Sequence, residues 1–224
     1  MNLILLALAP ICIIILYIYY KDKYEKEPPK LLIVSFLLGA ILSICITTVM
    51  YYGFDIVLPL PNKTSILEQF IKAFFVVGFT EEYSKYIIVK YYAQTKAAFN
   101  EPFDGIVYAV MVSMGFAATE NIVYVLDSGI QTALLRAFTA VPAHATFGIL
   151  MGYYIGKAKF SKHRILLNIA GLGLAILFHG AYDFFLFIDF VPGIWTGAFI
   201  SLFIGIVLSR NAIITHQNNS HFKI

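Results

Sequence analysis

The sequence predicts an all-α integral membrane protein, a polytopic helical bundle of about seven transmembrane helices that forms one domain over residues 1–224. Three observations predict this fold class: hydrophobic residues make up 60% of the chain, charged residues only 13%, and the mean hydropathy is +0.80. Soluble domains usually carry about 25% charged residues, so this chain lacks the polar surface that would keep it dissolved in water. The lipid bilayer is therefore its expected surroundings.

Seven segments are long enough to cross the hydrocarbon core, which takes about 20 mostly apolar residues in a helix. The predicted spans are 2–20, 31–53, 66–92, 103–126, 132–156, 165–187 and 193–209. Acidic and basic residues interrupt the third and fourth spans, but apolar residues continue on both sides of them. The chain then divides into two N-terminal spans (1–60), a core of spans (66–187), and a last span with a cytoplasmic tail (193–224).

The basic residues of the loops predict the orientation, because Lys and Arg gather on the cytoplasmic side of a membrane. Most of them lie in the loops at 21–30, 93–102 and 157–164 and in the tail, whereas the alternate loops hold little beyond Lys63 and Arg136. The N-terminus is therefore expected outside and the C-terminus in the cytoplasm. The net charge of +3 comes from these clusters, so it indicates orientation and anionic lipid, and no nucleic-acid partner is expected.

Ionisable residues inside the predicted spans are the strongest functional signal, since an Asp, Lys or Arg at a helix centre costs about 2.5–3.5 kcal/mol. They are Glu81, Glu82, Lys85, Glu120, His144, His179 and Asp183. A structural ion pair explains Glu81 and Lys85 as well as a function does, because they lie at i and i+4. Asp104 is better explained as a helix cap, and His163, His216 and His221, in loops or the tail, need no function. Structural ion pairs alone are a poor explanation for three glutamates, two histidines and an aspartate on four spans.

Small residues repeat every four positions on three of these spans, along the face that carries the ionisable residues. The stripes are Gly171 and Ala175 before His179 and Asp183; Ala140, Gly148, Gly152 and Gly156 around His144; and Gly105, Ala109, Ser113 and Ala117 before Glu120. Such stripes let membrane helices approach closely. The ionisable residues are therefore predicted to face tightly packed helix interfaces.

Four motifs follow one another on successive predicted spans. They are Glu81-Glu82-Tyr83-Ser84-Lys85 (E-E-x-x-K), Phe116 to Asn121 (F-x-x-x-E-N), His144 between Ala143 and Ala145, and His179 to Asp183 (H-x-x-x-D). In this order, from about residue 66 to residue 187, they resemble the PrsW family of intramembrane metalloproteases, distant relatives of the CAAX prenyl endoproteases and of CAAX-like bacterial immunity proteins. The position of Lys85, and Glu120 where the CAAX branch has histidine, favour PrsW.

The resemblance implies an enzyme, an intramembrane endopeptidase that acts as a multi-pass protein in a bacterial cell membrane. Its implied partner is a single-span membrane protein substrate. In the best-known bacterial member, the reaction is the first cut in an anti-sigma factor during stress signalling, on the extracytoplasmic side.

The residues themselves suggest roles in hydrolysis. Glu81 or Glu82 is the candidate general base, and Glu82 is preferred because Gly78, one turn earlier, leaves room beside it. The candidate catalytic residues are Glu81, Glu82, His144 and His179, and the candidate metal ligands are His144, His179, Asp183 and Glu120. Two imidazoles and a carboxylate suit a divalent metal, Zn²⁺ first, with one open position. Because no H-E-x-x-H motif is present, glutamate-activated water without a metal is the alternative.

Two other classes of protein share part of this pattern. A proton- or ion-coupled transporter or channel also uses buried acids and histidines, but the sequence has no inverted repeat and no matching pair of broken spans. A non-catalytic scaffold that binds helices through its glycine stripes is the third class.

At 1.5 Å per residue, the predicted span ends place the site near mid-depth, with Glu120 and Asp183 on its outer side. Cleavage is therefore expected in or just beyond the outer half of the membrane.

Overall fold

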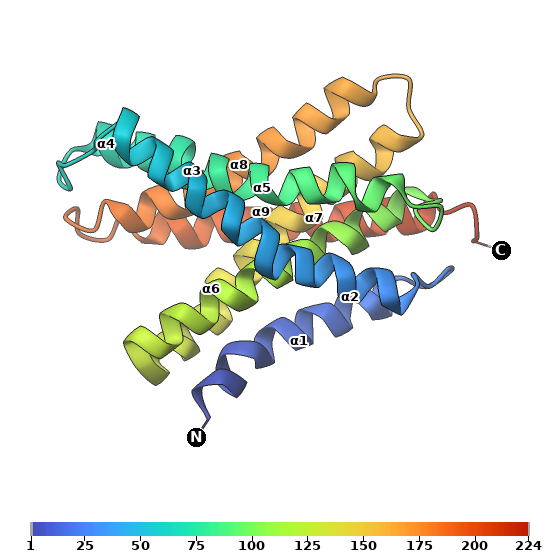
Figure 1. Ribbon diagram of the computed structural model, residues 1–224, viewed down its shortest axis with the longest axis horizontal. Helices are drawn as coiled ribbons and strands as arrows, with labels where there is room; N and C mark the ends of the chain where they lie inside the picture. Colours follow the sequence, from blue (N-terminus) through green and yellow to red (C-terminus); the bar gives the residue numbers. More distant parts are fainter. Residues whose placement is uncertain (1, 224) are drawn as a thin grey trace.

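All regular secondary structure in residues 2–223, the part that the computed structural model describes, is helical (Figure 1). The elements are α1 (Leu3–Lys21), α2 (Pro29–Leu38), η1 (Gly39–Ser43), α3 (Ile44–Val57), α4 (Ile66–Ile71), η2 (Lys72–Gly78), α5 (Phe79–Tyr91), η3 (Ala93–Thr95), α6 (Pro102–Phe138), α7 (Ala140–Lys159), α8 (Arg164–Phe187) and α9 (Thr196–Asn218). The predicted all-α fold is confirmed for these residues.

Five stretches are long and apolar enough to cross a membrane, which makes this a multi-pass membrane protein. They are Leu3–Lys21, Pro29–Val57, Pro102–Lys159, Arg164–Phe187 and Thr196–Asn218. The third stretch holds two helices, α6 and α7. The helix of α4, η2 and α5 is not among the five, because Lys72, Glu81, Glu82, Lys85 and Lys90 lower its hydropathy.

Two of the long helices contain a π-helical segment. These segments are η1 and η2. At both ends of each, the backbone dihedral angles are those of a right-handed helix, so the helix continues on either side. π-Helical turns are often found at functional sites. The segment η2 ends at Gly78, directly before the turn that carries Glu81 and Glu82.

The helices α6 and α7 pack as antiparallel neighbours along the predicted small-residue stripes. A Cβ atom added at Gly152 would overlap the backbone of Gly105, and one added at Gly156 would overlap the backbone of Pro102. Near the site, a Cβ atom added at Gly148 would lie 3.0 Å from the Cβ atom of Ser113, a tight contact without overlap. The prediction that small residues bring these helices close together is confirmed, and α6 is almost wholly buried from Phe103 to Ala118.

The predicted start of the fifth span, at residue 132, is wrong. Gly129, with φ of +80°, breaks α6, and the helix resumes until Thr139 (φ −124°, ψ −78°) ends it. The next helix, α7, begins at Ala140. The break at Gly129 falls between the predicted spans 103–126 and 132–156, but hydropathy did not mark the second boundary, at Thr139. The segment 130–138 carries Arg136 back against Glu120.

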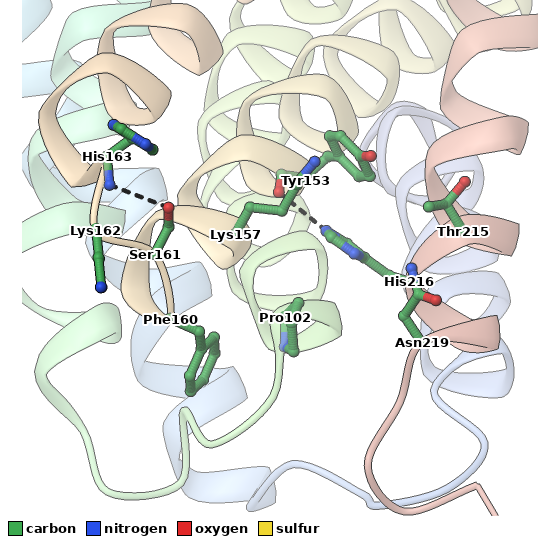
Figure 2. Close-up of a pocket in the computed structure, with 10 residues that line it drawn as sticks. All are labelled: Pro102, Tyr153, Lys157, Phe160, Ser161, Lys162, His163, Thr215, His216 and Asn219. Atoms are coloured by element: carbon green, nitrogen blue, oxygen red, sulfur yellow. Dashed lines mark hydrogen bonds between the residues drawn. The ribbon is translucent and has the colours of Figure 1, made fainter.

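The placement of His216 in a tail after residue 209 is also wrong. The last helix runs to Asn218, and His216 is 2% exposed, with its Nε2 atom 2.9 Å from the carbonyl oxygen of Tyr153. It lines a hollow of about 500 Å³ between the α7–α8 loop and the end of α9, together with Lys157 and Lys162 (Figure 2). This hydrogen bond and the stacking of the imidazole on the ring of Tyr153, 4.3 Å away, account for its burial.

The interpretation of Asp104 as a helix cap is confirmed. Its Oδ2 atom accepts hydrogen bonds from the backbone N–H groups of Asn100, at 2.7 Å, and Glu101, at 2.8 Å. The Glu101 side chain completes a capping box at the start of α6.

Candidate active site

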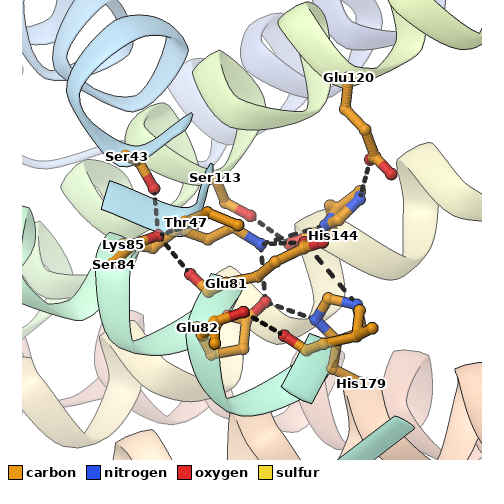
Figure 3. Close-up of polar contacts among 12 residues, drawn as sticks. Ser43, Thr47, Glu81, Glu82, Ser84, Lys85, Ser113, Glu120, His144 and His179 are labelled. Carbon is orange, nitrogen blue, oxygen red and sulfur yellow. Dashed lines mark hydrogen bonds and ion pairs between the residues drawn. The ribbon is translucent and has the colours of Figure 1, made fainter. Parts of the chain in front are cut away.

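Four buried side chains from three helices converge at the centre of the bundle (Figure 3). They are Glu81 and Glu82 of α5, His144 of α7 and His179 of α8. Each offers one carboxylate oxygen or imidazole nitrogen, and these four atoms all lie within 4.8 Å of one another. These are the four residues that the sequence suggested for catalysis, and packing brings them together although they are up to 98 positions apart (81 to 179).

A close approach of two helices places α5 against α8 at this point. A Cβ atom added at Gly78 would lie 3.2 Å from the backbone nitrogen of Gly180, the residue after His179. The space beside Gly78 is thus filled by the α8 backbone. This contact brings the imidazole Nδ1 atom of His179 to 2.8 Å from the Oε1 atom of Glu82.

The Nε2 atom of each histidine contacts a carboxylate. The Nε2 atom of His144 lies 2.8 Å from Oε2 of Glu120, and the Nε2 atom of His179 lies 3.3 Å from Oδ2 of Asp183. The Nδ1 atom of His144 faces the Lys85 ammonium at 3.3 Å. Since an ammonium only donates, Nδ1 of His144 accepts and its Nε2–H donates to Glu120.

Glu120 and Asp183 therefore stand behind the histidines, outside the group of four converging donors. The sequence suggested both as metal ligands; in the structure each lies outside the group of four and contacts an imidazole nitrogen of one of its histidines, an arrangement in which a carboxylate can orient the ring. Glu120 is further held by Arg136, whose Nη2 atom is 2.8 Å from its Oε2 atom.

Lys85 is buried among the site residues and pairs with both glutamates. Its Nζ atom lies 2.7 Å from Oε1 of Glu82, 3.5 Å from Oε2 of Glu81 and 4.1 Å from the ring centroid of Phe116. The predicted pair with Glu81 exists, but the closer partner is Glu82. Phe116, from the F-x-x-x-E-N motif, thus forms a wall of the site.

Several polar contacts of the site involve residues that the sequence did not indicate. The hydroxyl of Tyr51 in α3 donates to Oε1 of Glu81 at 2.8 Å. Behind the site, the hydroxyls of Thr47 and Ser84 are 3.0 Å apart, and Ser84 also contacts Ser43 (Figure 3). Hydroxyl groups are common in apolar spans, so nothing in the sequence distinguished these residues.

A cavity of about 1020 Å³ opens onto one side of this group. Its polar lining includes Glu81, Glu120, Arg136, His144, His179 and Asp183, and its apolar lining includes Phe116, Leu135, Leu186, Trp195 and Phe199. Glu81 reaches this space, whereas Glu82 is 0% exposed and does not line it. A water molecule in the cavity can therefore reach Glu81 and the two histidines, but not Glu82.

The donor set fits a divalent metal ion. Within residues 2–223, the Oε2 atoms of Glu81 and Glu82 are buried and have no hydrogen-bond partner. Carboxylates and imidazoles are the ligand types that zinc and similar metals accept. Because Lys85 already holds Glu82 and faces His144, and because both nitrogens of His179 contact carboxylates, a metal would replace some of these contacts.

Comparison with known proteins decides the family. Residues 27–209 match the family described as "PrsW family intramembrane metalloprotease". The chain belongs to the PrsW family. The matched range is wider than the four motifs, since it also takes in α2, α3 and most of α9.

Bacterial relatives of the chain carry the name Protease PrsW. The chain is 36% identical over 200 residues to that of Geobacillus kaustophilus (strain HTA426), covering 89% of this chain and 86% of the relative. It is 38% identical over 181 residues to that of Bacillus subtilis (strain 168), covering 80% of each protein. For Clostridioides difficile (strain 630) it is 37% over 205 residues, covering 85% and 81%. No solved structure matches the chain.

PrsW membership makes this protein an intramembrane metalloprotease, a hydrolase of peptide bonds, as the motifs implied. The transporter and the scaffold are therefore excluded as its primary class.

Proposed function

We propose that this protein hydrolyses a peptide bond of a single-span membrane protein in a bacterial cell membrane, making the first cut in an anti-sigma factor during stress signalling. The observation that carries the proteolytic part is the meeting of two glutamates and two histidines, of which Glu81, His144 and His179 line a cavity of about 1020 Å³. Its apolar lining suits an unwound segment of a membrane helix. The bacterial relatives support the location.

Glu81 is the proposed general base, in place of Glu82. Glu81 lines the cavity, and its Oε1 atom accepts a hydrogen bond from the Tyr51 hydroxyl. Its Oε2 atom is buried and has no hydrogen-bond partner within residues 2–223, which suits it to take a proton from a water molecule that enters the site. Glu82 is enclosed and engaged by Lys85 and His179. Its proposed role is to hold the ammonium group of Lys85 and the imidazole of His179 in place beside α5.

His144, His179 and the Oε2 atom of Glu82 would hold the metal, which we propose to be Zn²⁺. When bound, the metal supplies Lewis-acid polarisation of the scissile carbonyl and of the attacking water. Glu120 and Asp183 orient the imidazoles from behind. The apolar wall formed with Phe116, Trp195 and Phe199 keeps bulk water from the peptide segment.

Seven spans with the N-terminus outside and the C-terminus in the cytoplasm are proposed for the membrane topology. The helix of α4, η2 and α5 is the third span, and Glu81, Glu82 and Lys85 are accommodated in it because they face the site. In this orientation α7 starts on the outer side, and His144 lies four residues, or about 6 Å, from its start at Ala140. This supports cleavage in or just beyond the outer half of the membrane.

The test is incubation of the purified protein with single-span reporter proteins of known orientation, followed by fragment mapping by mass spectrometry. We expect fragments whose new ends lie on the outer flank of the substrate span, and none with the Glu81→Gln protein. Cleavage on the cytoplasmic flank would contradict the proposed topology or depth. Failure to cleave any single-span reporter, by a protein that cleaves soluble peptides, would contradict the substrate class.

A further inference from the structure

Arg136 holds the two polar residues of the F-x-x-x-E-N motif with one guanidinium group. Its Nη2 atom lies 2.8 Å from Oε2 of Glu120, and its Nε atom donates to Oδ1 of Asn121 at 2.7 Å. The group also lies over the ring of Tyr124, 4.2 Å from the centroid. Arg136 comes from the segment after Gly129, so these contacts depend on the break in α6.

The partners of Arg136 are themselves fixed. The side-chain amide of Asn121 is fully buried and donates to the backbone oxygen of Ala7 in α1 at 2.7 Å. The Oε2 atom of Glu120 faces Arg136 on one side and Nε2 of His144 on the other, 2.8 Å from each. An unbroken series of contacts therefore runs from α1 through Asn121, Arg136 and Glu120 to the imidazole of His144.

We propose that Arg136 is a positioning residue for the hydrolytic site: it holds the Glu120 carboxylate on Nε2 of His144 and so keeps Nδ1 of that ring turned, unprotonated, toward the converging donors. The proposal rests on the proposed function of that site. The contact between Nδ1 and the Lys85 ammonium is consistent with this tautomer. Carboxylates behind a ligating histidine commonly fix its tautomer and orientation.

A group that only neutralised the charge of Glu120 would not need to be an arginine. A lysine ammonium at position 136 would also be a counter-ion, but it lacks the planar pair of donors that reaches Glu120 and Asn121 together. Glu120 and Arg136 both line the cavity, so without the guanidinium the carboxylate is free to turn into that space. His144 would then lose the acceptor that holds its Nε2 proton.

The test compares Arg136→Gln and Arg136→Lys with the unchanged protein, measuring Zn²⁺ affinity by chelator competition. Loss of a residue behind a metal ligand typically lowers affinity or activity about 10–100-fold. We expect this loss of affinity in both variants, and a fall in kcat with little change in KM on a cleaved reporter. In metal-free protein, the ¹⁵N resonances of the His144 ring should move from one tautomer to a mixture. Arg164→Gln, which removes an exposed guanidinium at the start of α8, is the matched control.

A double-mutant cycle separates positioning through Glu120 from a general structural role. If Arg136 acts through Glu120, then Arg136→Gln should add little to the loss of affinity in a Glu120→Gln protein. Fully additive losses would overturn the proposal. So would normal Zn²⁺ affinity and an unchanged His144 tautomer in Arg136→Lys, because charge alone would then suffice; this variant decides the matter if Arg136→Gln does not fold. A wild-type protein that binds Zn²⁺ but cleaves no reporter would instead contradict the proposed function, leaving these measurements valid.

Discussion

The Nδ1 atom of His179 lies 2.8 Å from the Oε1 atom of Glu82, and the Lys85 ammonium lies 2.7 Å from the same oxygen. One buried carboxylate oxygen therefore joins α5 to α8 and also holds the central lysine. The neighbouring Glu81 faces the cavity instead and contacts Lys85 only at 3.5 Å. The two adjacent glutamates thus have different surroundings, and different consequences are expected when each is changed.

Glu81→Gln should abolish most cleavage without unfolding the protein. A general base typically contributes about 10²–10⁴-fold to the rate, and glutamine cannot take the proton. Glu82→Gln should also reduce cleavage but should in addition lower the thermal stability, because breaking a buried ion pair costs about 3–5 kcal/mol. Turnover per folded molecule and the melting temperature in detergent check both statements. Normal turnover by Glu81→Gln would rule it out as the base.

Removing the metal should stop the reaction reversibly. Active protein should hold about one Zn²⁺ per chain, by elemental analysis, as expected for a single site built from imidazole and carboxylate ligands. His144→Ala and His179→Ala should lose the metal, whereas alanine at the exposed His163 should retain it. A preparation that cleaves reporter protein without any metal would instead favour water activated by glutamate alone.

Tyr51→Phe should slow cleavage although it removes only one oxygen atom. The hydroxyl donates to Glu81 at 2.8 Å, and hydrogen bonds to charged groups contribute about 1.5–3 kcal/mol, or roughly 10–100-fold in rate if the contact persists in the transition state. The next residue, Tyr52, is 69% exposed and makes Tyr52→Phe a matched control. Equal rates for the two variants would show that the hydroxyl does not position the base.

Gly152→Ala should destabilise the protein, whereas Gly173→Ala should not. A Cβ atom at Gly152 would overlap the backbone of Gly105, but one at Gly173 would meet nothing within 4 Å. Overpacking a tight interface costs about 1–3 kcal/mol. Melting temperatures in detergent and the amount of protein in membranes measure the difference. Equal stability of the two variants would mean that α6 and α7 are less closely packed than this structure has them.

One physical reason made both the all-α fold and the candidate residues of the site predictable from the sequence. Polar groups are costly in a hydrocarbon layer, so the bilayer restricts spans to helices and makes every ionisable residue within them conspicuous. Seven ionisable residues stood out in this way, and four of them, Glu81, Glu82, His144 and His179, converge in the structure. The stripes of small residues likewise indicated which faces of α6 and α7 would meet.

The arrangement of those residues was decided only by tertiary structure. Whether Glu81 or Glu82 faces the cavity depends on how α5 is rotated against α8, and a hydropathy pattern does not contain that angle. Glu120 contacts both His144 and Arg136, outside the converging donors, and Arg136 returns to it only after the break at Gly129, which has a positive φ. Contacts between side chains on different helices depend on shifts of a few ångströms and on single backbone angles. Composition and spacing along one chain leave both undetermined.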